Sequence, residues 1–168
     1  MYTRTLAPID GSPTSSHAFD EALKIARETG ANLQPLFVID RPPVAGDAST
    51  AFYPDIHEAF RKEGDALAAD AAERMKRAGV PGVPRVVEVE LTGDDLAQRI
   101  LKSAEEYGAD LVVMGTHGRR GWRRIVLGSV AEHFLRLAFC PVLLVPHRTS
   151  ESRAEDPVDH PATEKEPS

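Results

Sequence analysis

The stretch Val112–Ser129, "VVMGTHGRRGWRRIVLGS", decides what kind of fold this chain forms. It starts with apolar residues typical of a buried strand, continues through four glycines and four arginines, and reaches a serine that suits the start of a helix. Glycine costs conformational entropy when it is ordered, so each one is expected to serve a left-handed turn or a close backbone approach. A helix that begins directly after such a loop offers its N–H groups to an anion, and phosphate is the first ligand to consider.

The composition describes one acidic domain of ordinary size. The chain has 168 residues and a formal net charge of −6, and its apolar side chains are numerous enough to bury a core. A negative balance argues against broad binding to nucleic acids or anionic membranes, which is done by basic surfaces. An anion site in this chain is therefore expected to be local.

Cysteine usage and the N-terminal residues bear on the compartment. Cys140 is the one cysteine, so no intrachain disulfide can form, and the N-terminal residues run directly into a strand pattern. No apolar run approaches the roughly 20 residues of a membrane span. We therefore expect a cytoplasmic protein without a membrane anchor.

The first half of the chain predicts two strand–helix units. Thr5–Asp10 is a short apolar strand, and the helix after it has Ser12 as its N-cap, Pro13 at its first position and Gly30 as its stop. Asn32–Asp40 is a continuous apolar strand of the kind that helices cover on both faces. The segments that follow are a loop over Arg41–Pro54 and a helix over Ile56–Ala78.

The second half continues the alternation and ends in the strand "CPVLLVP". Pro84–Leu91 alternates as a third strand, Asp94–Gly108 has the spacing of a helix, and Ala109–Gly115 is a fourth, continuously apolar strand. The last helix is predicted to start at Ser129, which forms the S-x-x-E pattern of a capping box with Glu132.

Strands that alternate with helices predict an α/β fold: a single domain on a doubly wound, five-stranded parallel sheet with helices on both faces. We take the Rossmann-like strand order 3-2-1-4-5, in which the fourth strand lies beside the first. Residues 1–146 then form the domain, and the polar residues 147–168 form a disordered tail. Ligands of such sheets bind beyond the carboxyl ends of the strands where the order reverses, which brings Asp10 beside Gly115.

The loop after the fourth strand has groups that suit phosphate, whereas the common nucleotide fingerprints are absent. Neither G-x-x-x-x-G-K-[ST] nor a G-x-G-x-x-G after the first strand occurs, which disfavours P-loop proteins and dehydrogenases. N–H groups at Gly128, Ser129 and Val130 can bind phosphate oxygens, and Gly115 and Gly118 allow the backbone to come close. Local positive potential comes from Arg119, Arg120, Arg123 and Arg124.

The spacing Gly115-x2-Gly118-x9-Gly128-Ser129 resembles the ATP-binding signature G-x2-G-x9-G-[ST] of the universal stress protein family. The segments "PIDGS", "LFVID", "ADLVVMGTHG" and "CPVLLVP" extend the resemblance over about Thr3–Pro146. The branch of the family that does not bind nucleotide lacks the glycine–serine signature, which this chain has in full. The resemblance therefore points to the ATP-binding branch.

This resemblance implies an ATP site, with magnesium held mainly through the phosphates, and a homodimer through the last strand, Pro141–Val145. Asp10 corresponds to the residue at the ribose, and the backbone of Val38 corresponds to the group at the adenine. Met114 and Gly115 would border the base and the ribose. The full set of positions carried over is Pro8, Ile9, Asp10, Val38, Met114, Gly115, Gly118, Gly128, Ser129 and Val130.

Three functions fit these observations. We expect a stress-response regulator or sensor in which ATP orders the Gly115–Ser129 loop. The ordered loop and the Arg41–Pro54 segment would then present a surface to partners. A slow ATPase or autophosphorylating protein that modifies Thr116 or Ser129 is an alternative, although no general base is arranged for efficient turnover and we assign no catalytic residue. The third alternative is a dimerisation module without nucleotide, held through an apolar edge strand.

Several of these residues also have a purely structural interpretation. Ser129 and Glu132 can be only a helix cap, Asp10 can be only the Asx turn that leads into the first helix, and the arginines can be a solvated loop. Ser129 and His133 lie one helical turn apart, but without a third orienting group we do not assign hydrolysis to them. The histidines show no zinc-like spacing, so no metal site of their own is expected.

Overall fold

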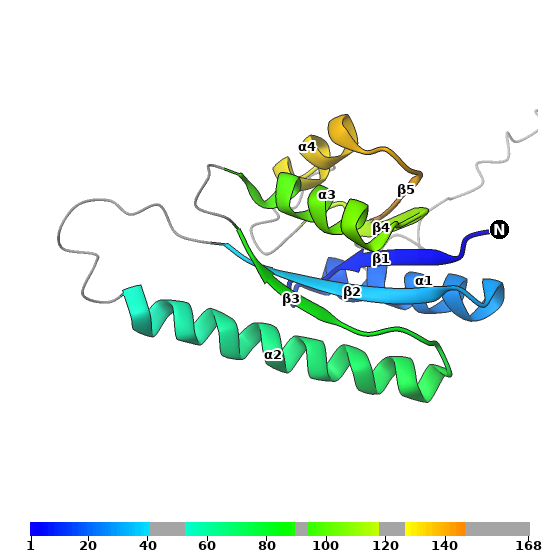
Figure 1. The fold of residues 1–168 in the computed structure, drawn as a ribbon, viewed down its shortest axis with the longest axis horizontal. Helices are drawn as coiled ribbons and strands as arrows, with labels where there is room; N and C mark the ends of the chain where they lie inside the picture. Colours follow the sequence, from blue (N-terminus) through cyan, green and yellow to red (C-terminus); the bar gives the residue numbers. More distant parts are fainter. Residues whose placement is uncertain (41–52, 90–93, 118–126, 147–168) are drawn as a thin grey trace, which may run out of the picture.

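The structure is a computed structural model that describes residues 1–40, 53–89, 94–117 and 127–146. Strands and helices alternate along this part of the chain (Figure 1), and none of the described helices is both long and apolar enough to cross a membrane. In chain order the elements are β1 (Arg4–Pro8), α1 (Pro13–Thr29), β2 (Asn32–Ile39), α2 (Tyr53–Ala78), β3 (Arg85–Glu88), α3 (Leu96–Tyr107), β4 (Leu111–Gly115), α4 (Ser129–Leu137) and β5 (Val142–Val145).

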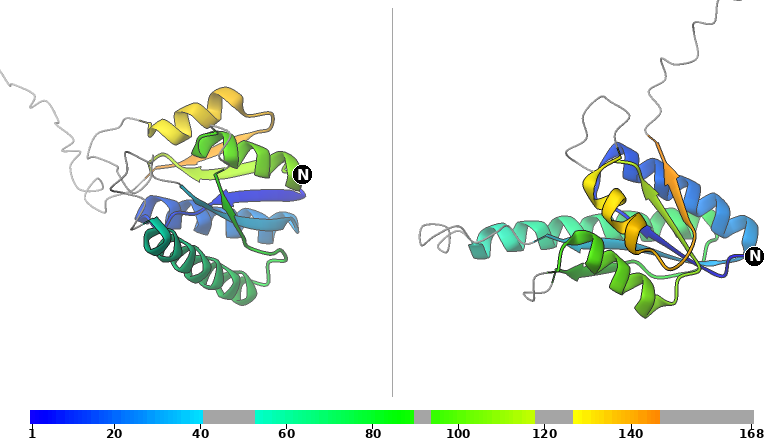
Figure 2. Two further views of the ribbon diagram at one scale, coloured as in Figure 1. Left: turned by 60° about the vertical axis from the view of Figure 1, so that its left-hand side comes forward. Right: turned by 90° about the horizontal axis from the view of Figure 1, so that it is seen from above.

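The strands form one five-stranded sheet in the order β3-β2-β1-β4-β5, and every neighbouring pair is parallel. Helices α1 and α2 cover one face of the sheet, and α3 and α4 cover the other (Figures 1 and 2). The α/β class and the predicted strand order are therefore confirmed.

The core consists of two layers, one on each face of the sheet. Phe19 anchors the layer under α1 and α2, and Phe134 anchors the layer under α3 and α4; their side chains are 1% and 0% exposed. Neighbouring residues of β4 enter opposite layers, as Val113 packs with Phe19 and Val112 packs with Phe134. Because helices cover both faces, β4 is continuously apolar instead of alternating.

Caps predicted from the sequence define both ends of α1. Ser12 Oγ accepts a hydrogen bond from the Ser15 N–H at 3.2 Å, which satisfies one donor of the first turn. Gly30 ends the helix with a φ of 71°, a left-handed conformation that costs glycine little. Gly108 ends α3 in the same way, with a φ of 68°. The predicted Ser12 cap and the glycine stops are confirmed.

Most element boundaries differ from the sequence prediction by one or two residues, and the largest differences are in α2 and β3. Helix α2 begins at Tyr53 instead of Ile56, and Pro54 is tolerated there because N–H groups of a first turn have no acceptor within the helix. Strand β3 is shorter than the predicted Pro84–Leu91, although Val89 still donates its N–H to the Ile39 carbonyl at 3.1 Å. The predicted loop over 41–52, the end of the predicted third strand in 90–93 and the predicted tail over 147–168 lie outside the described residues.

Candidate functional site

The carboxyl ends of β1 and β4 leave the sheet beside each other. Thr5 lies opposite Leu111 and Leu6 lies opposite Val112, so the two strands run parallel toward this edge. Strand β2 lies on the other side of β1, which makes the gap between β1 and β4 the point where the strand order reverses. The topology therefore brings Asp10 and Gly115 to the same edge, as predicted.

The residues on the two sides of the loop after β4 are joined by a hydrogen bond. The Gly128 N–H donates to the Thr116 carbonyl at 2.8 Å, and the Thr116 N–H donates to the Val145 carbonyl at 3.0 Å. The start of α4 is thereby tied to the end of β4. Gly118 and the four arginines of the loop, Arg119, Arg120, Arg123 and Arg124, lie outside the described residues.

Helix α4 begins with a glycine cap, and the predicted capping box at Ser129 is wrong. Gly128 is the N-cap, with an extended conformation (φ −65°, ψ 149°), and its carbonyl accepts the first helical hydrogen bond from the Glu132 N–H at 2.9 Å. Ser129 is already helical and cannot cap the helix, while the Glu132 carboxylate pairs with Arg136 at 2.6 Å. Because glycine has no side chain, no oxygen of the cap residue reaches the N–H groups of the first turn.

Asp10 shapes the turn between β1 and α1. Its Oδ1 accepts a hydrogen bond from the Ser12 N–H at 2.9 Å, which is the geometry of an Asx turn, and its own N–H donates to Ser15 Oγ at 3.1 Å. The structural interpretation of Asp10 as a helix-entry residue is therefore confirmed. If Asp10 also binds a ribose, it would do so with a carboxylate that this turn already holds in place.

Gly115 is required by the packing of α1 against β4. A Cβ atom at this position would lie 2.8 Å from Thr14 Cγ2, closer than real Cβ contacts, and 3.1 Å from the Thr14 carbonyl carbon, which is tighter than most of them. Thr14 is buried in the first turn of α1. The sequence predicts that a ligand comes close to the backbone at Gly115. In the structure, helix α1 comes close to it, at least on this side.

The other apolar residues of the predicted site, four assigned to the adenosine and Val130 assigned to the phosphates, divide between the two layers. Val38 and Met114 pack into the α3–α4 layer, and Val130 packs against the same layer from the first turn of α4. Ile9 is buried in the α1–α2 layer, and Pro8 ends β1 between them. The structure thus brings Val38, Met114 and Val130 onto one face, while Ile9 faces away from them.

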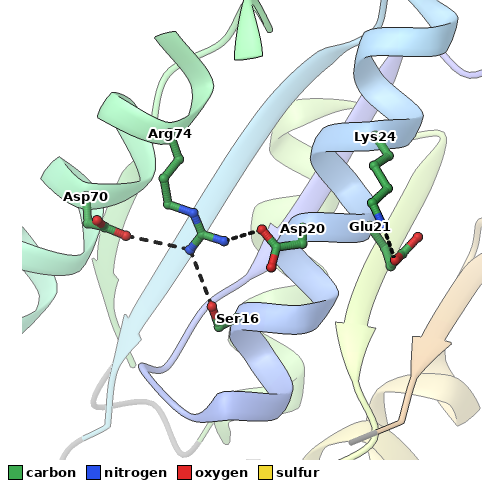
Figure 3. Close-up of polar contacts among 6 residues, drawn as sticks. All are labelled: Ser16, Asp20, Glu21, Lys24, Asp70 and Arg74. Carbon is green, nitrogen blue, oxygen red and sulfur yellow. Dashed lines mark hydrogen bonds and ion pairs between the residues drawn. The ribbon is translucent and has the colours of Figure 1, made fainter. Parts of the chain in front are cut away.

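An ion cluster behind the β1–α1 turn holds α2 against α1 (Figure 3). Arg74 Nη2 donates to Asp20 Oδ1 at 2.6 Å, Nη1 lies 3.5 Å from Ser16 Oγ, and the guanidinium lies 4.6 Å from the centre of the Phe19 ring. A cation over an aromatic face gains electrostatic attraction in addition to the ion pair. No sequence motif indicates this cluster, because it joins residues of two different helices.

A second contact missed by the sequence analysis joins α3 to α4. His133 Nδ1 lies 2.6 Å from Asp95 Oδ2, and Asp95 is also the N-cap of α3. Burial opposes ionisation of Asp95, but hydrogen bonds from the Gln98 N–H and from His133, together with the His133 charge, outweigh it and lower the pKa of the Asp95 carboxyl. His133 therefore faces the cap of α3 in this structure.

Two cavities lie near the ends of the sheet. A cavity of about 490 Å³ at the amino ends of the strands is lined by Arg4, Gln34 and Tyr107 among others, and none of the predicted site residues lines it. A smaller cavity of about 110 Å³ lies beyond the carboxyl end of β1, where Ile9, Gly11 and Arg74 contribute to its wall. The larger cavity is therefore separate from the edge that carries the glycine signature.

A parallel sheet whose order reverses between β1 and β4, with a glycine-capped helix at that reversal, defines a doubly wound α/β protein. The model of the universal stress protein family matches residues 1–146. The chain belongs to the universal stress protein family.

Relatives and solved structures are similar over most of the chain. Universal stress protein MJ0531 of Methanocaldococcus jannaschii is 34% identical over 145 residues, which cover 86% of this chain and 82% of that protein. The crystal structure of a universal stress protein family member from Burkholderia pseudomallei is 41% identical, covers 87% of this chain and 97% of that one, and has a TM-score of 0.69. A universal stress protein solved in complex with cAMP is 26% identical, covers 86% and 97% of the two chains, and has a TM-score of 0.63.

Proposed function

We propose that this protein binds ATP, with magnesium held mainly through the phosphates, and acts as a stress-response regulator or sensor through nucleotide-dependent conformation and dimer contacts. The observation that carries the proposal is the start of α4: its cap is a glycine, and the Gly128 N–H is tied to Thr116 at the reversal of the strand order. The similar universal stress protein solved with cAMP supports an adenine nucleotide as the ligand.

The phosphates are proposed to lie at the N-terminus of α4, where aligned peptide dipoles favour negative charge. Ser129 and Val130 offer the backbone N–H groups, whereas the N–H of Gly128 already donates to the Thr116 carbonyl, so that Gly128 contributes only a cap without a side chain. Gly118 belongs to the same cradle by its place in the signature. Magnesium would be bound through the phosphates, since the described residues contain no group of three or more His, Cys, Asp or Glu arranged to hold a metal.

The adenosine is proposed to lie between the carboxyl ends of β1, β2 and β4. Asp10 would accept hydrogen bonds from the ribose, and the Val38 backbone would contact the adenine. Met114 and Gly115 would border the base and ribose, with Pro8 and Ile9 shaping the end of β1. The contact of Val38 and Met114 with one layer of the core supports a base on the α3–α4 side of the sheet.

Nucleotide recovery and titration test this site. The purified protein is denatured and the released small molecules are separated by chromatography, while the nucleotide-free protein is titrated with ATP and magnesium by calorimetry. Gly128→Val is the control variant, because the extended conformation of Gly128 (φ −65°, ψ 149°) is open to other residues and the added side chain would cover the cradle. We expect saturable binding that this variant loses.

The opposite result is equally informative. If no adenine nucleotide is recovered and no binding is detected at millimolar ATP, the glycines serve only the turn and the packing of α1. Dimerisation without nucleotide would then be the leading function.

A homodimer through Pro141–Val145 is part of the proposal. Strand β5 is at an edge of the sheet, and Leu143 is 38% exposed, while Phe139 just before the strand is 50% exposed. An exposed apolar edge strand normally finds a partner strand. Light scattering should give a dimer for the unmodified protein and a monomer for Leu143→Lys. Val83→Lys, at an exposed valine outside β5, is the matched control and should remain dimeric.

Slow phosphoryl transfer to Thr116 is a second candidate, favoured by one contact. Thr116 Oγ1 lies 3.0 Å from His117 Nδ1, so a neutral imidazole could take the hydroxyl proton while the oxygen bonds to the γ-phosphorus and ADP leaves. Incubation with ATP should then add one phosphoryl group to the intact protein. Thr116→Val should abolish the added mass and Thr116→Ser should retain it; labelling that persists in Thr116→Val would exclude this acceptor.

A further inference from the structure

We propose that the contact between Asp95 and His133 positions the N-terminus of α4 for nucleotide binding. This inference rests on the proposed function, because it assigns a positioning pair to the proposed phosphate site. Neither side chain is required to touch the nucleotide. Their role is to hold the helix whose first turn does so.

Asp95 serves two helices with its two carboxylate oxygens. Oδ1 accepts a hydrogen bond from the Gln98 N–H at 2.9 Å, and Gln98 returns one by accepting from the Asp95 N–H at 2.8 Å. This reciprocal pair is a capping box, which fixes the carboxylate at the start of α3. Oδ2 lies 2.6 Å from His133 Nδ1 in the second turn of α4. A rigid group of α3 therefore holds α4 near its start.

Helix α4 needs such support because it is short and begins without a side-chain cap. It covers nine residues, below the length at which isolated helices are stable in water. Its buried residues, Ala131 and Phe134, fix the side that faces the sheet. The Asp95 contact adds a polar restraint against α3, and His133 lies one helical turn from Ser129, on the same face. Movement of α4 along its axis would displace the N–H groups of Ser129 and Val130.

The pair is partly exposed to solvent, which limits the size of the effect. The side chains of His133 and Asp95 are 41% and 52% exposed, and exposed pairs are screened by water. We therefore expect ATP binding to weaken by about three- to fivefold when the contact is lost, and not to disappear.

Variants can separate the contact from the cap of α3. Asp95→Ser keeps a good N-cap but is too short to supply the second oxygen to His133. His133→Leu removes the donor, whereas His133→Asn retains an N–H donor at about the place of Nδ1 without the positive charge. Glu132→Gln is the matched control, because among the described residues its carboxylate pairs with Arg136 of the same helix, at 2.6 Å. All variants are checked for folding by thermal melting.

The measurements are calorimetric titration with ATP and magnesium, and amide hydrogen exchange of α4 without nucleotide. Asp95→Ser and His133→Leu should each weaken binding and speed exchange of the amides at positions 132 and 133, and the double variant should be no worse than either single one. His133→Asn and Glu132→Gln should bind like the unmodified protein. Loss of affinity in His133→Asn as large as in His133→Leu would overturn a positioning role.

The outcome also separates this inference from the proposed function. If the unmodified protein binds no nucleotide, the proposed function fails and the inference fails with it. If the unmodified protein binds ATP and both Asp95→Ser and His133→Leu bind it equally tightly, only the inference is overturned.

Discussion

Helices α1 and α4 both begin at the carboxyl edge of the sheet, but their first turns are completed differently. At α1, Ser12 and Asp10 bind backbone N–H groups, so the turn satisfies its own donors. At α4, Gly128 is the cap and has no side chain with which to do so. Side chains therefore occupy N–H groups at the start of α1, whereas the cap residue of α4 has no side chain that could occupy them.

The largest effect is expected at Gly115, where α1 contacts β4. Gly115→Ala should lower the free energy of unfolding by about 2 kcal/mol, because its Cβ would collide with Thr14. Urea denaturation measures the loss. Adding Thr14→Ser should recover part of it, since Thr14 Cγ2 is the nearest atom at 2.8 Å. Gly128→Ala is the control, and an equal loss there would mean that the two glycines of the signature have the same structural role.

The serine before α1 should matter more for stability than the serine at the start of α4. Ser12→Ala removes the acceptor of the Ser15 N–H and should cost about 1 kcal/mol. Ser129 is exposed and does not cap α4, so Ser129→Ala should change stability by only a few tenths of a kcal/mol at most. Thermal melting of the two variants measures both losses of stability. A comparable loss at both positions would restore a capping role for Ser129.

Converting the cap of α4 into one like that of α1 should have opposite effects on stability and binding. Gly128→Ser supplies an oxygen for the first turn and should raise stability by a few tenths of a kcal/mol. The same oxygen would occupy N–H groups proposed for the phosphates, so the affinity for ATP should fall. Denaturation and calorimetry on one preparation measure both. A variant that gains stability and binds ATP as before would remove the basis of the proposed cradle.

The smallest effect concerns acid stability through the cap of α3. Because the pKa of Asp95 is lowered in the folded protein, its contribution to stability is present above its unfolded pKa and is lost as the pH falls through the folded value. Asp95→Asn keeps a capping side chain that does not titrate, so its stability should fall less steeply than that of the unmodified protein below about pH 4. Urea midpoints at neutral and acidic pH give the two slopes. Parallel slopes would show that Asp95 is not coupled to folding.

Sequence patterns predict the architecture well because it depends on local features. Apolar runs and glycine stops define the strands and helices. Because the strands are parallel and joined by long crossovers, only a few orders of the strands in the sheet are possible. The cap of α4 was harder to assign because Gly128 and Ser129 are both acceptable caps, and only the backbone angles of Gly128 decide between them.

Contacts between distant residues could not be predicted from one sequence. The collision that makes Gly115 necessary comes from Thr14 of another helix, and the partner of His133 is the cap of α3. Periodicity assigns a residue to a face, but it does not say which side chain of a neighbouring element meets it. The sequence therefore identifies where the ligand edge lies, while the structure identifies what supports it.

Thr116 connects the proposed nucleotide site to the edge strand. Its carbonyl accepts from Gly128 at the start of α4, and its N–H donates to Val145 at the end of β5. On the proposed function, a nucleotide that shifts this residue changes the free energy of association through β5. Linkage is reciprocal, so association must then change nucleotide affinity by the same factor. The apparent dissociation constant for ATP would accordingly depend on the concentration of the protein itself.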